Sequence, residues 1–235
     1  MKAERLYIKI FIWISAVVLI FTAHRAYAAP TYGTDVPKKK QISVGYQNNT
    51  VFRHDLSDSY GNVRSYQHYL EVSYGVASWF SLDGKIGMGN AIQRGGIYPK
   101  VEYPYGFAGG YGFRILALND VKNRVRVALG FHHISVHPGA KNVNNNRYDA
   151  ILDEWQCSVT ASKDIGWFRP FLGIKALKSD LICMVNNIDK KWRPPKYFGG
   201  PVVGCTVLFP KGLSARIEGH FIDETSLSTG IYYTF

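Results

Sequence analysis

Residues 230–235 read GIYYTF, and their alternation is the clearest pointer to the fold. Successive side chains of an extended strand point to opposite faces, so Ile231, Tyr233 and Phe235 share one face. The residues between them are small or polar apart from a second tyrosine, and the alternation reaches back to Leu227. One face is therefore apolar, and the fold depends on whether that face meets a protein core or lipid.

The same alternation of apolar and polar residues recurs along the chain after the basic run at residues 38–40. Sixteen Tyr, thirteen Phe and twenty-three Gly also favour twisted sheet with tight turns over a helical fold. A closed antiparallel up-and-down β-barrel fits this pattern, and both soluble and outer-membrane barrels satisfy it. We predict ten strands, at residues 41–53, 65–76, 79–89, 105–117, 123–135, 149–162, 167–177, 197–209, 213–222 and 226–235.

Charged residues on the face opposite the apolar rows favour the membrane barrel. They have both signs and are interleaved with glycines, which suits a narrow polar lumen closed by ion pairs. We expect Asp83 and Lys85 to meet arginines of neighbouring strands, and Arg216 to meet Glu218 or Glu154. The predicted lumen network comprises Glu71, Asp83, Lys85, Arg114, Arg124, Arg126, Glu154, Lys175, Arg216 and Glu218.

The connections also alternate between short and long, as in outer-membrane barrels with short periplasmic turns and long outer loops. The aromatic residue Phe235, with Tyr233 before it, resembles the C-terminal signal of bacterial outer-membrane proteins. That resemblance implies an outer-membrane location and recognition by the barrel-assembly machinery. The aromatic face of the last strand would then lie in the periplasmic aromatic girdle.

The first 28 residues have the layout of a secretory signal peptide: basic residues, an apolar run from Ile10 to Phe21, and small residues at Ala26 and Ala28. We expect residues 29–40 to be a periplasmic segment and residues 41–235 to form the barrel domain. Cleavage would remove four basic residues and one acidic residue, which lowers the formal net charge from +11 to +8. This balance favours anionic partners, whether lipid, lipopolysaccharide or nucleic acid. For an exported protein we expect outer-membrane lipid and lipopolysaccharide, and no nucleic acid.

The predicted long loop 178–196 carries a candidate binding site. Its cations flank an aromatic residue, a combination that suits anionic glycolipid or surface polymer. The candidate residues are Lys190, Lys191, Trp192 and Arg193. No cofactor or metal site is predicted, since the three cysteines form no C-x-x-C pair.

One stretch, GFHHISVHPG at residues 130–139, favours an enzyme instead. His133 and Ser135 are two residues apart, so both lie on the lipid-facing row of their strand. This H-x-S arrangement resembles the lipid A deacylase family, which implies Ser135 as nucleophile and His133 as base, with Asp149 or Glu154 as the orienting acid. The non-catalytic interpretation is a pair of histidines at the membrane interface, at the start of a loop.

The sequence therefore predicts a non-enzymatic outer-membrane barrel with a plugged lumen, acting in structural support or in loop-mediated binding. A lipid A acyl-ester hydrolase is the alternative, and a small-solute channel is the third hypothesis.

Overall fold

The computed structural model describes residues 30–96 and 99–235, so the predicted signal peptide lies outside the described residues. Twelve antiparallel strands and one short 3-10 turn make up the described secondary structure. They are β1 (Ile42–Asp55), β2 (Asn62–Ala77), β3 (Phe80–Arg94), β4 (Val101–Asp120), β5 (Val125–His137), β6 (Lys141–Val143), β7 (Asn146–Lys163), β8 (Phe168–Val185), β9 (Ile188–Arg193), β10 (Gly199–Leu208), η1 (Pro210–Gly212), β11 (Leu213–His220) and β12 (Thr225–Thr234).

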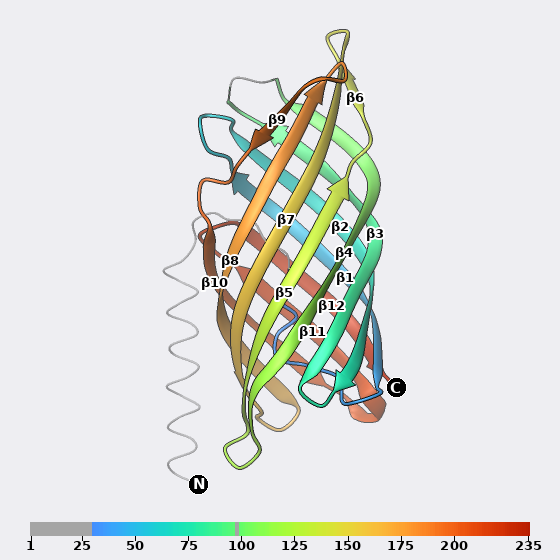
Figure 1. The fold of residues 1–235 in the computed structure, drawn as a ribbon, viewed down its shortest axis with the longest axis vertical. Helices are drawn as coiled ribbons and strands as arrows, with labels where there is room; N and C mark the ends of the chain where they lie inside the picture. The colour runs from blue at the N-terminus through green and yellow to red at the C-terminus, as the bar shows by residue number, and fades with distance from the viewer. Residues whose placement is uncertain (1–29, 97–98) are drawn as a thin grey trace.

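Ten of these strands close into a barrel (Figure 1). The last strand, β12, pairs with β1, and β7 pairs with β8 in addition to β5, so every edge of the ring is paired. The predicted ten-stranded, closed antiparallel barrel is confirmed. No helix within the described residues is long and apolar enough to cross a membrane.

The strands β6 and β9 are short and extend the barrel at one end, shown at the top in Figure 1. They pair with β7 and β8 through two-residue turns at Asn144–Asn145 and Asn186–Asn187, and all four asparagines have positive φ. Asparagine tolerates this left-handed conformation, and such turns match the twist of a hairpin. The segments predicted as long loops at 136–148 and 178–196 are therefore mostly hairpin.

The apolar rows face outward, as predicted. Leu70, Ile86 and Leu172 are each about half exposed, while the intervening side chains Glu71, Lys85 and others of the same strands are buried. Large apolar side chains on the outside and charges on the inside are the reverse of a soluble protein. Because hydrocarbon provides no water to satisfy backbone groups, a closed ring with this exterior spans a membrane.

Residues 29–40 were expected to form a periplasmic segment, and the structure places residues 30–37 of it inside the barrel. Its described part enters the lumen from the short-turn end, where it is seen in blue inside the lower half of the barrel in Figure 1. Thr31, Tyr32 and Thr34 are all at most 1% exposed. We call residues 30–37 the lumen strap.

The opposite end of the lumen is filled by apolar side chains, which the sequence analysis did not predict. They come from β1, β2, β3, β4, β7 and β8, above the level of the charged residues. The buried members are Val51, Leu56, Val63, Ala91, Val101, Tyr103, Ala150, Leu181 and Cys183. Most members of this outer apolar cluster lie beyond the predicted strand ends; Val51 and Ala150 lie within predicted strands.

Candidate functional site: the filled lumen and an outer serine

The centre of the lumen is organised by Arg114 on β4. Its Nε and Nη2 donate to the carboxylate of Asp83 on β3 at 2.9 and 2.6 Å, and Nη2 also donates to Ser73 Oγ at 3.0 Å. Its Nη1 donates to the carbonyl oxygens of Tyr32 and Asp35 at 3.3 and 2.8 Å. These contacts use every N–H donor of the guanidinium. A buried ion pair expected from the sequence thus also holds the lumen strap.

The ring of Tyr32 fills the space beside this pair. It stacks on His132 with ring centroids 4.3 Å apart, and Lys85 Nζ lies 4.4 Å from its centroid. Lys85 also donates to Gln47 Oε1 at 2.9 Å. Glu71 accepts a long hydrogen bond from Tyr232, at 3.4 Å. An aromatic ring between cations is favourable when it is buried. Tyr32 lies between Lys85 and Arg114, so this side chain of the strap completes the lumen network.

A second buried cluster surrounds Lys175 on β8. Its Nζ lies 2.8 Å from Asp223 Oδ2 and 2.7 Å from His220 Nδ1. His220 Nε2 in turn lies 2.8 Å from Glu218, which also accepts a hydrogen bond from Thr31 Oγ1 at 2.9 Å. The cluster joins β8, β11 and the strap.

The connection between β11 and β12 contributes Asp223 and Glu224 to this cluster, and both are buried. The sequence analysis missed them. The sequence signal that could have indicated them is the presence of two adjacent acidic residues directly before the last strand.

The short-turn end of the lumen holds three more arginines. Arg126 Nη2 lies 3.3 Å from Asp164, and Arg169 pairs with both Asp164 and Asp35. Arg216 lies 3.5 Å from Asp35 Oδ2. Its ion pair is thus with the strap and not with Glu218 or Glu154, the partners expected from the sequence, although Glu218 still interacts with Arg216 electrostatically.

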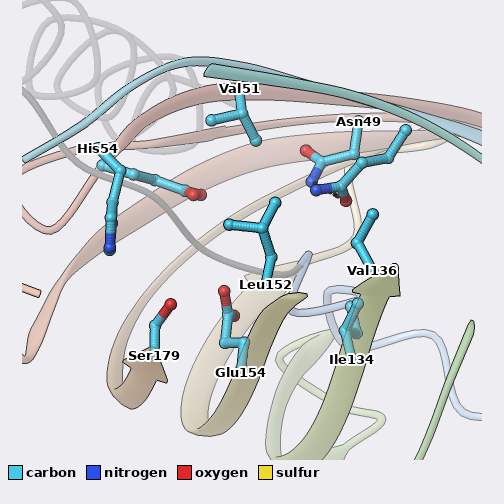
Figure 2. Close-up of a pocket in the computed structure, with 10 residues that line it drawn as sticks. Asn49, Val51, His54, Ile134, Val136, Leu152, Glu154 and Ser179 are labelled. Carbon is cyan, nitrogen blue, oxygen red and sulfur yellow. Dashed lines mark hydrogen bonds between the residues drawn. The ribbon is translucent and has the colours of Figure 1, made fainter. Parts of the chain in front are cut away.

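Of two further residues assigned to the lumen from the sequence, one lies elsewhere. Arg124 was expected in the lumen, but it is exposed in the turn between β4 and β5 with a φ of 56°. Glu154 does face the lumen, where it lines a small cavity of about 30 Å³ together with His54, Gln67 and Glu224 (Figure 2). That space holds about one water molecule.

The candidate binding loop is divided by the hairpin of β8 and β9. Trp192 is exposed, whereas Arg193 is 2% exposed and lies over the ring of Tyr60 at 5.1 Å. Arg193 was expected at the outer rim and is instead an interior cation, because neighbouring residues of β9 point to opposite sides. Lys190 and Lys191 lie on β9, and their side chains are outside the described residues.

The H-x-S residues lie on the outer face of β5, as expected. The histidine hydrogen-bonded to Ser135 is His137, whose Nε2 lies 2.9 Å from Ser135 Oγ. His133 instead stacks on Trp155 at 4.0 Å between centroids, and its Nε2 lies 3.7 Å from Asp153 Oδ1.

The acid across from this serine is Asp153, its cross-strand partner on β7. The expected acids were wrong. Asp149 pairs with Arg147, and Glu154 points into the lumen. A one-residue difference along a strand selects the opposite face, which is why Asp153 and not Glu154 lies outside.

No family model matches the sequence, and no curated protein matches it. Solved structures similar to it are bacterial barrels. An outer membrane channel from Pseudomonas putida F1 has a TM-score of 0.45 at 9% identity, covering 89% of this chain and 100% of that chain. The translocator domain of the autotransporter NalP from Neisseria meningitidis has a TM-score of 0.40 at 10% identity, covering 99% and 97%. These likenesses are too distant to carry function to this chain.

The barrel's own geometry determines its class. A paired ring of ten strands has an apolar exterior and buried ion pairs inside, which together are the features of an outer-membrane barrel. The chain is a β-barrel protein of the bacterial outer membrane.

Proposed function

We propose that this protein is a non-enzymatic outer-membrane barrel with a lumen closed to solutes, and that it supports the membrane and binds anionic glycolipid at its outer end. The observation that carries the closed lumen is Arg114, since its guanidinium ties the strap carbonyls of Tyr32 and Asp35 to the barrel wall. An ion pair that is buried and fully hydrogen-bonded is costly to open.

The lumen has a second obstruction. The outer apolar cluster fills the opposite end, and a ten-stranded barrel encloses little more space than its own side chains occupy. A solute would have to displace both the strap and this cluster. The barrel is therefore better suited to support and display than to transport.

Planar-bilayer recording tests the closed lumen. The purified wild-type protein is expected to give no stable open-pore steps, and a variant lacking residues 30–37 is expected to give more current than wild type. Stable steps from the wild-type protein, at a size typical of an aqueous pore, would contradict the proposal and favour the small-solute channel.

Binding of anionic glycolipid is supported by the outer hairpin of β8 and β9. Trp192 is 53% exposed there, and Lys190 and Lys191 precede it on the same strand. A tryptophan that follows two lysines in the sequence suits the boundary between acyl chains and phosphates. A Lys190→Gln/Lys191→Gln double variant is expected to retain less lipopolysaccharide in a co-purification assay than wild type. An Arg147→Gln variant at the neighbouring hairpin is the control, and equal losses in both would contradict a specific site.

A lipid A acyl-ester hydrolase is a second candidate, favoured by the 2.9 Å contact between Ser135 Oγ and His137 Nε2 on the lipid-facing side. In such a reaction His137 accepts the hydroxyl proton while Ser135 Oγ attacks the ester carbonyl, and the proton then passes to the leaving alkoxide. Water would release the acyl group from Ser135. His137 and not His133 is the base in this geometry.

Mass spectrometry of lipid A separates the two candidates. Cells expressing wild type, Ser135→Ala or His137→Gln are compared, with Ser228→Ala in the lumen as a control for expression. Loss of an acyl chain in wild type and in Ser228→Ala, but in neither of the other variants, would establish the hydrolase and overturn the non-enzymatic proposal. An identical lipid A profile in all four strains supports the non-enzymatic proposal.

A further inference from the structure

The short-turn end of the lumen opens into a cavity of about 280 Å³ that no part of the proposed function uses. Five basic side chains line it against two lining carboxylates, Asp35 and Glu71, and Arg114, Arg126 and Arg169 also pair with Asp83 or Asp164 outside the lining set. The basic residues are Lys38, Arg114, Arg126, Arg169 and Arg216. Cavities lined by one sign of charge concentrate ions of the opposite sign.

Asp35 shows what this wall recognises. Its Oδ1 pairs with Arg169 Nη1, and its Oδ2 accepts a hydrogen bond from Thr206 Oγ1 at 2.6 Å and lies 3.5 Å from Arg216 Nη2. Two guanidinium groups and a hydroxyl around one carboxylate form a typical oxyanion-binding arrangement. The carboxylate that occupies it belongs to the strap, which is not a strand of the barrel.

Arg216 has donors to spare. Its Nε and Nη1 are buried and have no hydrogen-bond partner within the described part of the chain, although the residue is only 8% exposed. Its ring contact with Tyr232, at 4.6 Å, leaves these N–H groups unused. Leaving a buried charged donor unsatisfied costs stability, so an anion that enters the cavity and reaches this edge of the guanidinium would relieve that cost.

Arg126 can assist from the neighbouring wall. Its one ion pair within the described residues is the 3.3 Å contact with Asp164, and its side chain is 27% exposed. Arg114 cannot assist, because all its donors are engaged by Asp83, Ser73 and the strap.

We propose that the cavity at the short-turn end of the lumen is a binding site for one small soluble oxyanion, a carboxylate or a phosphate, received by the free edge of Arg216. Asp35 neutralises the same arginines and acts as a tethered competitor that limits the affinity. The site faces the periplasm, where both barrel termini and the short turns lie.

Isothermal titration calorimetry of the full-length mature protein in detergent micelles tests the site. The probes are potassium phosphate and potassium succinate, with potassium chloride as the control for ionic strength. Asp35→Asn is expected to bind at least one probe about tenfold more tightly than wild type, since a competing charge is removed. Arg216→Gln is expected to weaken binding about tenfold.

Arg147→Gln is the matched control, because Arg147 pairs with Asp149 at the far end of the barrel. Its affinity should equal that of wild type. Gel electrophoresis verifies that each variant is folded: a folded barrel migrates faster when the sample is left unheated than after it is heated. If Arg216→Gln does not fold, Arg126→Gln replaces it, with an expected loss of about threefold.

The proposal is overturned if neither probe binds to wild type or to Asp35→Asn beyond the chloride control. Equal affinities for wild type, Asp35→Asn and the arginine variants would overturn it as well. Preference for phosphate over succinate, or the reverse, identifies which oxyanion the site takes. These outcomes are independent of bilayer conductance, so the site and the closed lumen can fail separately.

Discussion

Arg114 on β4 binds both carboxylate oxygens of Asp83 on β3, in a pair whose side chains are 2% and 0% exposed. The same guanidinium donates to two carbonyl oxygens of the lumen strap. The pair therefore links the wall of the barrel to the segment that fills it. Its removal should affect both the stability of the barrel and the position of the strap.

Arg114→Ala is expected to destabilise the folded barrel by about 3–5 kcal/mol, because it leaves the Asp83 carboxylate buried without its partner. Urea unfolding in detergent or lipid vesicles measures the change. The double variant Arg114→Leu/Asp83→Leu should recover most of this loss, since neither charge then remains. A double variant as unstable as Arg114→Ala would contradict the assigned cause.

Two glycines of β3 provide a matched pair. A Cβ on Gly87 would lie 1.8 Å from the backbone oxygen of His68, whereas a Cβ on Gly84 would meet nothing within 4 Å. Gly87→Val is therefore expected to prevent folding or to lower the unfolding midpoint strongly, and Gly84→Val is expected to fold like wild type. Heat-modifiable gel mobility and urea titration distinguish the two. Equal behaviour would show that β3 can shift away from β2.

The outward apolar rows predict a cost for charge on the lipid face. Leu172 on β8 is 49% exposed and pairs in register with Val203 and Ala161. Leu172→Lys is expected to cost up to about 2–4 kcal/mol in lipid vesicles, since a lysine in hydrocarbon is poorly solvated. Val121→Lys in the short turn after β4 should be close to neutral. A neutral Leu172→Lys would place this face in water.

The turn at Asn144–Asn145 predicts a dependence on backbone conformation. Asn145 has a φ of 62°, which β-branched residues rarely adopt. Asn145→Val is expected to cost about 1–3 kcal/mol in the outer hairpin, and Asn145→Gly to cost little. Hydrogen exchange at β6 and β7 measures this locally. Asn142→Val, inside β6, is the control and should be tolerated. If Asn142→Val also speeds hydrogen exchange, the destabilisation by Asn145→Val has a cause other than turn strain.

The alternation of side chains was sufficient to predict the ten strands of the ring, its closure and the direction of the apolar rows, but not β6 and β9. Rows such as Leu70 and Val72 are outward because period-two alternation is local and needs no knowledge of distant contacts. The two asparagine pairs also signalled hairpin turns, since asparagine tolerates positive φ. These turns were not predicted because both segments were assigned to long loops. The outer apolar cluster was missed because the strands were ended too early.

The composition of the lumen could be predicted only in part. Asp83 and Arg114 lie on adjacent strands, so their meeting follows from strand order. Glu154 was placed correctly inside, whereas Arg193 was not, because its orientation depends on where β9 begins.

The sequence alone predicted a barrel whose apolar residues face lipid, because that pattern is set by neighbours two residues apart. Three features followed only from the folded structure: the strap threads the lumen, Asp35 of the strap pairs with Arg216, and His137 is the histidine beside Ser135. Those contacts join positions far apart in the chain or depend on the chosen side-chain rotamer. They are determined by how charges and rings fill a closed space, which no local pattern specifies.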